Sequence, residues 1–333
     1  MKRILVIGAG LIGSRHIKTV QAHVGCSLAG VVDPDPAYQP EPGVVRFTDL
    51  ADVDVPVDGA IIATPTGLHR SHGEAAARRG WHLLIEKPVA GTVEDALALD
   101  AVVKRCGVHC LVGHHRRYHD SIQKLRDVIA SGKIGEPVTS TMIWAVRKPD
   151  EYFNTDWRRT GGSPVMINLI HDVDLLRFVL GEIADATGFS SQTQRAAGRV
   201  ESGAVALRFA SGVCGTISFT DTAPSPWGFE AATAENPNIA ATGQDMWWIT
   251  GTEGGVSFPS LTLWTGADSW AEAPVSEVVH ASRTTPLMAQ LDHFVDVIGG
   301  KAAPLNPISD AGESLRVTQE LEELLSMQGA KTT

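Results

Sequence analysis

Cysteine is scarce in this chain, and long apolar runs are missing. Only four of the 333 residues are cysteine, which is too few and too unevenly spaced for a disulfide framework, so we expect free thiols in a reducing compartment. No apolar run is long enough to span a bilayer, and no charged and apolar leader precedes the first predicted strand. These absences predict a cytoplasmic protein without a membrane partner.

Positive charge is in deficit as well. The net charge of −10 would repel phosphates, so nucleic acid is not expected as a partner. Histidine and cysteine do gather between Cys106 and His115. However, residues 108–112 have the pattern of a strand, whose neighbouring side chains point to opposite faces, and the spacing fits no zinc motif. We therefore predict no metal site.

The length is about twice that of a common single domain and predicts two domains. In residues 1–118, short runs rich in Ile, Val and Leu alternate with helical patterns. This alternation is typical of a parallel sheet covered by helices, and it predicts an α/β dinucleotide-binding domain of the Rossmann type. The predicted strands are 2–7, 27–32, 59–63, 81–85 and 108–112, and the predicted helices are 11–22, 68–79 and 92–104.

Residues 119–333 follow a different pattern. Alternation with a period of two, in which Thr216 and Ser218 are interleaved with Ile217 and Phe219, predicts strands with one buried and one wetter face. This second domain is expected to be α+β, with a sheet interrupted by helices. The predicted strands are 137–146, 205–209, 213–219 and 246–250, and the predicted helices are 121–129, 164–180, 286–298 and 309–325.

A glycine fingerprint joins the first strand to the first helix in the run Gly8-Ala9-Gly10-Leu11-Ile12-Gly13. Gly8 permits a tight turn, Gly10 lets the backbone approach a pyrophosphate, and Gly13 lets the helix and the strand pack closely. The start of the helix then offers unpaired N–H groups to phosphates. We predict that this run, including Leu11 and Ile12, binds a dinucleotide.

Asp33 ends the next strand, about twenty residues further on, which is where the fingerprint requires an acidic residue. Its carboxylate can accept hydrogen bonds from the ribose hydroxyls and would repel a 2′-phosphate. No arginine is expected beside it to receive such a phosphate. We therefore predict NAD as the cofactor in preference to NADP.

A polar pair marks the helix predicted at 164–180, whose start is signalled by Ser163 as N-cap and Pro164 in the first turn. Asn168 and His171 lie three residues apart and so share a face of a helix that is otherwise apolar. Such a pair needs polar partners, and a substrate bearing hydroxyl groups would supply them. A histidine satisfied within the core is the alternative for His171.

Together with Glu86-Lys87-Pro88, these features resemble the glucose–fructose oxidoreductase/inositol dehydrogenase family, called Gfo/Idh/MocA. The resemblance covers nearly the whole length. It implies a Rossmann domain followed by a domain with a large, mainly antiparallel open sheet, through whose outer face members form homodimers or homotetramers. The further matching runs are Ala63-Thr64-Pro65-Thr66-Gly67-Leu68-His69, Gly113-His114-His115-Arg116-Arg117-Tyr118, Asp156-Trp157-Arg158 and 161–174.

The resemblance directs attention to Lys87 and His171 as the catalytic pair. A hydride would leave the substrate for NAD while the hydroxyl proton passes to one of the two side chains, and Lys87 would stabilise the developing negative charge on oxygen. The family pattern places an aspartate four residues before the histidine, where this chain has Ile167. Asn168 therefore becomes a group that orients the substrate, because an amide cannot take up the proton. A surface Lys87 paired with Glu86 is the alternative.

Further site residues follow from the same runs. Ala63, Thr64, Pro65 and His69 follow a strand end and are expected to contact the cofactor with Glu86. Arg116, Tyr118, Trp157, Arg158 and Trp227 are the remaining substrate-binding candidates. Trp157 filling the domain junction and the loop around Trp227 acting as an interface are the alternatives.

The sequence thus predicts an NAD-dependent dehydrogenase or ketone reductase for a sugar, cyclitol or related polyhydroxylated ring. A relative acting on a dihydrodiol or ring aldehyde is the second enzymatic hypothesis. A non-catalytic NAD-binding sensor is the hypothesis from another class, and loss of the lysine or the histidine would have favoured it. Both residues are present.

Overall fold

The computed structural model describes residues 1–155, 158, 162–195, 198–236, 238–282 and 285–329. The chain forms two compact units. Unit 1 comprises Met1–Tyr118 and Thr284–Arg316, and unit 2 comprises His119–Arg283 and Val317–Thr333. The chain therefore returns to unit 1 after completing most of unit 2, whereas the sequence reasoning had assigned all of 119–333 to a second domain. Among the described residues, no helix has the length and apolar character needed to cross a membrane.

Unit 1 is built on a six-stranded parallel sheet in the order β3-β2-β1-β4-β5-β6. The alternation of strands and helices predicted this arrangement, and the Rossmann-type fold is confirmed. Its strands are β1 Lys2–Ile7, β2 Cys26–Val32, β3 Arg46–Phe47, β4 Gly59–Ile62, β5 His82–Ile85 and β6 Cys110–Val112. The central strands are apolar and buried, as expected where helices cover both faces.

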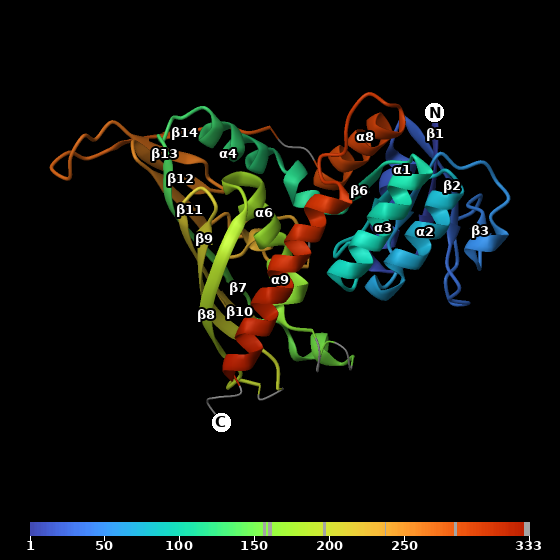
Figure 1. Cartoon of the computed structure of the whole chain (residues 1–333), viewed down its shortest axis with the longest axis horizontal. Coiled ribbons are helices and arrows are strands. Elements are labelled where there is room, and N and C mark those ends of the chain that lie inside the picture. The colour runs from blue at the N-terminus through green and yellow to red at the C-terminus, as the bar shows by residue number, and fades with distance from the viewer. Residues whose placement is uncertain (156–157, 159–161, 196–197, 237, 283–284, 330–333) are drawn as a thin grey trace. The chain divides into compact units, whose positions relative to one another are not determined.

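The helices of unit 1 pack around this sheet (Figure 1). They are α1 Leu11–Ala22, α2 His69–Arg78, α3 Val93–Cys106 and α8 Pro286–Ile298, with the 3₁₀ turns η1 Leu50–Asp52, η2 Thr66–Leu68 and η3 His115–Tyr118. α8 belongs to the late segment, and its side chains Phe294 and Ile298 lie so close to Gly59 that a Cβ there would come within 2.9 Å of both. This close packing explains why the segment belongs to unit 1.

Unit 2 is built on an eight-stranded sheet in the order β14-β13-β12-β11-β7-β10-β9-β8. Only β7 and β10 pair in parallel, so the expected mainly antiparallel sheet is confirmed. Its strands are β7 Pro137–Ala145, β8 Ile183–Ser191, β9 Ser202–Phe209, β10 Cys214–Thr220, β11 Trp247–Gly251, β12 Gly254–Phe258, β13 Thr262–Thr265 and β14 Val275–Val278. Sequence reasoning missed β8, β12, β13 and β14.

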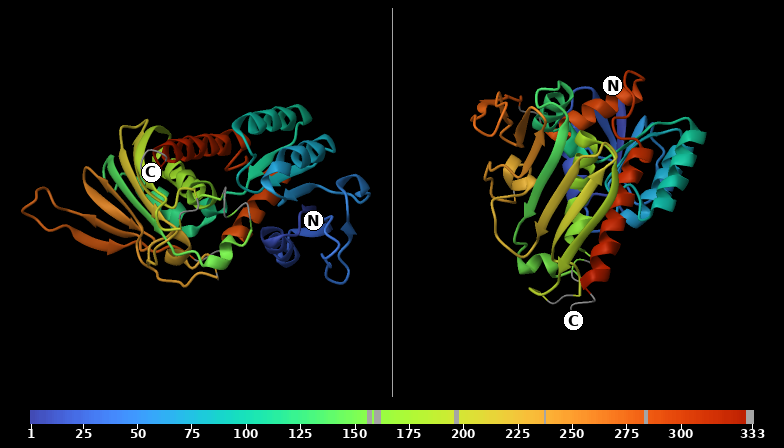
Figure 2. Two further views of the ribbon diagram at one scale, coloured as in Figure 1. Left: turned by 90° about the horizontal axis from the view of Figure 1, so that it is seen from below. Right: turned by 60° about the vertical axis from the view of Figure 1, so that its left-hand side comes forward.

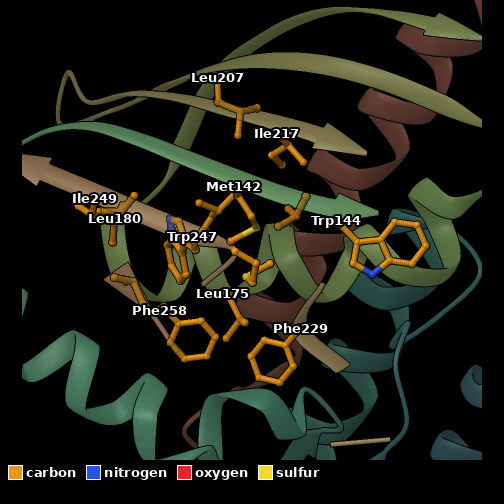
Figure 3. Packing of buried hydrophobic residues seen from close by; sticks show 14 of the residues in the cluster. Met142, Trp144, Leu175, Leu180, Leu207, Ile217, Phe229, Trp247, Ile249 and Phe258 are labelled. Carbon is orange, nitrogen blue, oxygen red and sulfur yellow. The ribbon is translucent and has the colours of Figure 1, made fainter. Parts of the chain in front are cut away.

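One face of this sheet carries the core of unit 2. Its side chains pack against α6, as Figure 2 shows for the elements and Figure 3 for the side chains, where Met142, Trp247 and Leu175 meet. The period-two prediction for β10 is confirmed, because Ile217 and Phe219 are buried while Thr216 and Ser218 are exposed. The helices of unit 2 are α4 Asp120–Ala130, α6 Ile170–Leu180 and α7 Phe229–Thr233, with the 3₁₀ turn η4 Asp150–Phe153; α9 Ile308–Gly329 runs from unit 1 into unit 2.

The helix predicted at 164–180 is not uniform. Val165–Leu169 (η5) is a π-helical turn, and the α-helix α6 begins only at Ile170. The Oγ of Ser163 accepts a hydrogen bond from the N–H of Met166 at 3.3 Å and also bonds to Glu322, so the predicted start signal is used. π-turns are rare and often occur at functional sites. This turn holds Asn168.

Candidate active site

The glycine fingerprint has the geometry that a dinucleotide requires. Gly8 has a φ of +92°, and a Cβ at Gly13 would lie 2.0 Å from the carbonyl oxygen of Gly8. No atom lies within 4 Å of the position of a Cβ on Gly10, which is the N-cap of α1 and has no side-chain cap. The start of α1 is therefore open and its first N–H groups are uncapped by side chains, which fits a pyrophosphate. Leu11 is exposed and Ile12 is half-buried beside it.

Asp33 closes the fingerprint loop. Its Oδ2 accepts a hydrogen bond from the N–H of Ala9 at 2.6 Å, and its Oδ1 accepts one from the N–H of Asp35 at 2.9 Å. A carboxylate has about four acceptor positions, so capacity remains for ribose hydroxyls. The half-buried Asp33 thus fits the adenosine end of NAD.

One part of the sequence argument against NADP was wrong, because an arginine does lie beside Asp33. β3 pairs with β2 and brings Arg46 alongside, where its Nη2 donates to the carbonyl oxygens of Asp33 at 3.2 Å and Asp35 at 2.7 Å. The guanidinium is therefore already engaged by backbone oxygens. The sequence could not show this, since Arg46 stands thirteen residues further along the chain.

His69 ties together the two loops that follow β4 and β5. Its Nε2 lies 2.8 Å from the carbonyl oxygen of Thr64, and its Nδ1 lies 2.8 Å from that of Pro88. The ring is buried. Ala63, Thr64 and the exposed Pro65 thus stand at the carboxyl end of β4, the edge at which open α/β sheets bind ligands. The contacts of His69 join these two loops.

Glu86 is buried, and it is bound by a histidine that sequence reasoning missed. His16, on α1, places its Nε2 2.7 Å from Glu86 Oε1. Burial raises the pKa of Glu86, but the hydrogen bond from His16 and the charges of His16, His115 and Lys87 outweigh burial and lower the pKa to about 2. Glu86 is therefore an anion in the core of unit 1, beside Lys87.

Lys87 is half-buried and is the second residue after the end of β5. Its backbone N–H donates to Glu86 Oε2 at 3.2 Å, and its peptide bond to Pro88 is cis. The lysine thus stands on the same edge of the sheet as the fingerprint and the Thr64 loop. Arg116 and Tyr118, in η3, are both buried, and the ring of Tyr118 contacts His293 at 5.6 Å between centroids.

In unit 2, Asn168 lies in the π-helical turn η5, and His171 lies in the α-helix α6 that follows it. Asn168 is half-buried, and its Oδ1 accepts a hydrogen bond from Lys148 Nζ at 2.8 Å. His171 is buried in the first turn of α6. Lys148 is the second residue of the candidate site that sequence reasoning missed, because Arg147-Lys148-Pro149 is typical of an exposed loop. The signal that could have found Lys148 is its place directly after the predicted apolar strand 137–146 and Arg147.

Tyr152 brings Arg158 into the same cluster. The Arg158 guanidinium lies 4.4 Å from the centroid of the Tyr152 ring, and Lys148 Nζ lies 4.9 Å from it. Trp157 lies outside the described residues. Trp227 is exposed, and its carbonyl oxygen accepts a hydrogen bond from the N–H of Ala145 at 2.8 Å, which places it beside the end of β7.

Comparison with known families identifies the class of protein. Residues 2–114 match the profile described as "Oxidoreductase family, NAD-binding Rossmann fold", and residues 122–257 match the "GFO/IDH/MocA C-terminal domain". The chain therefore belongs to the Gfo/Idh/MocA oxidoreductase family, as its motifs had indicated, and its cofactor is NAD.

The relatives include enzymes named for a sugar and for a cyclitol, and also a 1-carboxy-3-chloro-3,4-dihydroxycyclohexa-1,5-diene dehydrogenase of Comamonas testosteroni. The chain is similar to the 1,5-anhydro-D-fructose reductase of Ensifer adhaerens, with 32% identity over 64% of this chain and 67% of that protein. It is also similar to the inositol 2-dehydrogenase of Rhizobium meliloti, with 32% identity over 65% of this chain and 68% of that protein. An oxidoreductase from Agrobacterium radiobacter, solved with NAD⁺, L-tartaric acid and magnesium, shares the fold, with a TM-score of 0.81, 18% identity and coverage of 100% and 97%.

Proposed function

We propose that this protein is an NAD-dependent dehydrogenase that interconverts a carbinol and a carbonyl group on a sugar, cyclitol or related polyhydroxylated ring. The observation that carries the proposal is the position of Lys87 on the ligand edge of the parallel sheet, beside the ionised Glu86. The names of the relatives support the choice of substrate class. When bound, NAD accepts a hydride from the carbinol carbon.

The side chains of this chain supply the proton chemistry. Lys87 donates to the substrate oxygen and stabilises the negative charge that develops there. The buried Glu86 carboxylate holds the loop of Lys87 through its backbone N–H and favours the protonated ammonium. His171 is the second candidate for proton transfer, since histidine titrates near neutral pH without assistance. Asn168 orients the hydroxyl groups of the ring.

The test is a screen of cyclitols, aldoses and lactones with NAD and with NADP, followed by the absorbance of the reduced nicotinamide. We expect turnover with NAD, and a preference for NADP would contradict the role given to Asp33. Lys87→Met should lower kcat by about 10²- to 10⁴-fold, because general acid–base assistance of this size is lost. NADH affinity, measured by fluorescence titration, should change little. Lys104→Met, on an exposed lysine of α3, is the matched control.

We also propose that the protein forms a homodimer or homotetramer through the outer face of the unit 2 sheet. The exposed side chains of the central strands β7, β10 and β11 are uncharged, which favours burial against a second copy. They are Val138, Thr139, Thr141, Cys214, Thr216, Ser218 and Thr250. Light scattering should give a smaller species for Thr216→Lys than for the wild type, and an unchanged mass would contradict this assignment.

The proposed location is the cytoplasm. All four cysteines are unpaired, which suits a reducing compartment.

A further inference from the structure

A buried lysine in unit 2 has a role that the proposed proton chemistry does not use. Lys148 stands three residues beyond the end of β7, where its backbone N–H donates to the carbonyl oxygen of Asp221 at 3.0 Å. The neighbours Arg147 and Pro149 are exposed, but the Lys148 side chain is only 8% exposed. The chain thus turns one basic side chain inward from an otherwise exposed loop. A buried ammonium is costly unless an anion or several acceptors receive it.

The ammonium of Lys148 has more donors than acceptors around it. It has three N–H groups and, within the part of the chain that the structure describes, makes one hydrogen bond, to Asn168 Oδ1 at 2.8 Å. The carboxylate of Asp221 lies 3.8 Å away, beyond hydrogen-bond distance. The ring faces of Tyr152 at 4.9 Å and Trp144 at 5.6 Å also lie beside it, and the charge of the Glu230 carboxylate acts on it as well. Ring faces attract a cation but accept no full hydrogen bond.

Asp221 cannot make up this shortfall, because two arginines already use it. Arg195 donates to its Oδ1 at 2.7 Å, and Arg199 donates to its Oδ2 at 2.9 Å. Asp221 is fully buried, so one carboxylate faces three cations in a region of low dielectric. The two guanidinium groups take up both oxygens of Asp221, and Lys148 lies beyond hydrogen-bond distance of this carboxylate. A ligand that brings an anion would complete the cluster.

Asn168 supplies a second donor at the same place. An amide oxygen that accepts from the lysine must leave the NH₂ group of the same amide to donate elsewhere. The lysine therefore fixes which way the amide points, and the pair presents an ammonium and an amide N–H to a ligand. Two donors match the two oxygens of a carboxylate, and the ammonium also supplies the charge that a hydroxyl group would not need.

We infer that Lys148 and Asn168 together bind a carboxylate of the substrate. The substrate is then a hydroxy acid, such as a sugar acid or a carboxylated cyclitol. The inference rests on the proposed function and narrows its substrate class. Lys148 is a specificity-determining residue in this account, and the proton transfer stays with Lys87 or His171. A purely structural Lys148 is the competing explanation.

The experiment compares matched acid and neutral substrates in the presence of NAD. D-Galacturonate is paired with D-galactose, D-gluconate with D-sorbitol, and quinate with myo-inositol, and kcat and KM are measured for each. We expect the wild type to have a higher kcat/KM for the acid of at least one pair. Lys148→Met should raise KM for that acid by about 10- to 100-fold, since a hydrogen bond to a charged group is lost. Its KM for the neutral partner should rise less than that for the acid, because only the orientation of the Asn168 amide is lost there.

Two further variants separate recognition from folding. Lys148→Arg keeps the charge and should retain part of the preference for the acid, whereas Lys133→Met removes an exposed lysine of unit 2 and should change nothing. Circular dichroism and NADH binding show whether each variant is folded. If Lys148→Met lowers activity on acid and neutral compounds alike, or if the wild type prefers every neutral partner, the inference is overturned while the proposed function stands. If no compound is turned over with NAD or NADP, the proposed function fails, and the inference fails with it.

Discussion

Each unit has a buried carboxylate among basic side chains, Glu86 in unit 1 and Asp221 in unit 2, but the two clusters divide the charge differently. In unit 1, Glu86 receives a hydrogen bond from His16 and lies beside Lys87. In unit 2, two arginines occupy both oxygens of Asp221, and Lys148 is left at 3.8 Å. The carboxylate of unit 1 therefore favours a protonated lysine, and that of unit 2 leaves its lysine in need of a further anion. This difference suits one lysine to the chemistry and the other to recognition.

The pKa values express the same contrast. The pKa of Glu86 is lowered to about 2, because the basic groups outweigh burial. The pKa of Lys148 is lowered to about 8, because burial outweighs the carboxylates of Asp221 and Glu230, while Arg199 and Arg195 add to the repulsion. A carboxylate with enough partners stays ionised, whereas an ammonium with too few partners loses its proton more easily.

Asp221→Asn should have the largest effect on this comparison. The neutral amide leaves Arg195 and Arg199 without their anion in a buried site, and we expect the free energy of unfolding of unit 2 to fall by about 3–5 kcal/mol. Urea denaturation followed by tryptophan fluorescence reports on unit 2, because every tryptophan except Trp81 belongs to it.

The matched control for this variant is Asp185→Asn, which removes an exposed carboxylate whose partner is Arg208. Exposed ion pairs contribute less than about 1 kcal/mol, so the control should be close to the wild type. Equal losses of unfolding free energy in the two variants would show that the buried Asp221 contributes no more stability than an exposed carboxylate.

Glu86→Gln tests the ion site of unit 1 through pH. The folded pKa of about 2 lies below the ordinary value of 4.5, so Glu86 contributes stability above pH 4.5 that is lost as the pH falls toward 2. The wild type should therefore lose about 2 kcal/mol more than Glu86→Gln between pH 5 and pH 3. Calorimetry measures the difference, and Glu94→Gln, at an exposed position of α3, is the control. Parallel pH curves would mean that Glu86 is not held as an anion.

The recognition site of unit 2 should respond to alkaline pH. Lys148 binds an acid only while it is protonated, so kcat/KM for the acidic substrate should fall about tenfold per pH unit above pH 8. This alkaline fall in kcat/KM should move to higher pH in Lys148→Arg, because arginine keeps its charge. The pH dependence of kcat/KM for a neutral substrate of the same enzyme separates the titration of Lys148 from that of other groups. If kcat/KM falls in the same way for the acidic and the neutral substrate, the fall belongs to the catalytic groups instead of Lys148.

Thr92→Ala has the smallest expected effect and serves to sharpen the comparison. Thr92 Oγ1 accepts a hydrogen bond from the N–H of Asp95 at 3.1 Å at the start of α3. Loss of this cap should cost about 1 kcal/mol of stability. The pH dependence attributed to Glu86 should persist in this variant, and calorimetry at pH 5 and pH 3 shows whether it does.

The two units were not equally open to prediction. In unit 1, β1 and α1 occupy the predicted ranges 2–7 and 11–22, since long apolar and periodic runs decide them locally. In unit 2, β8 was missed because Ile183–Ser191 is rich in Ala, Gly, Ser and Asp, which favour strands weakly. Such a strand forms because its neighbour β9 supplies the hydrogen bonds and the core receives its few apolar side chains.

The sequence by itself determined the Rossmann-type fold of unit 1 and the family, because the residues of the predicted dinucleotide site are close together in short motifs and parallel strands deliver them to one edge. Only the tertiary structure decided which charges meet. His16 and Glu86 are separated by 70 residues, and Lys148 and Asp221 belong to different strand ends. Whether a buried charge is compensated depends on every group within a few ångströms of it, and no local pattern of residues records that distance.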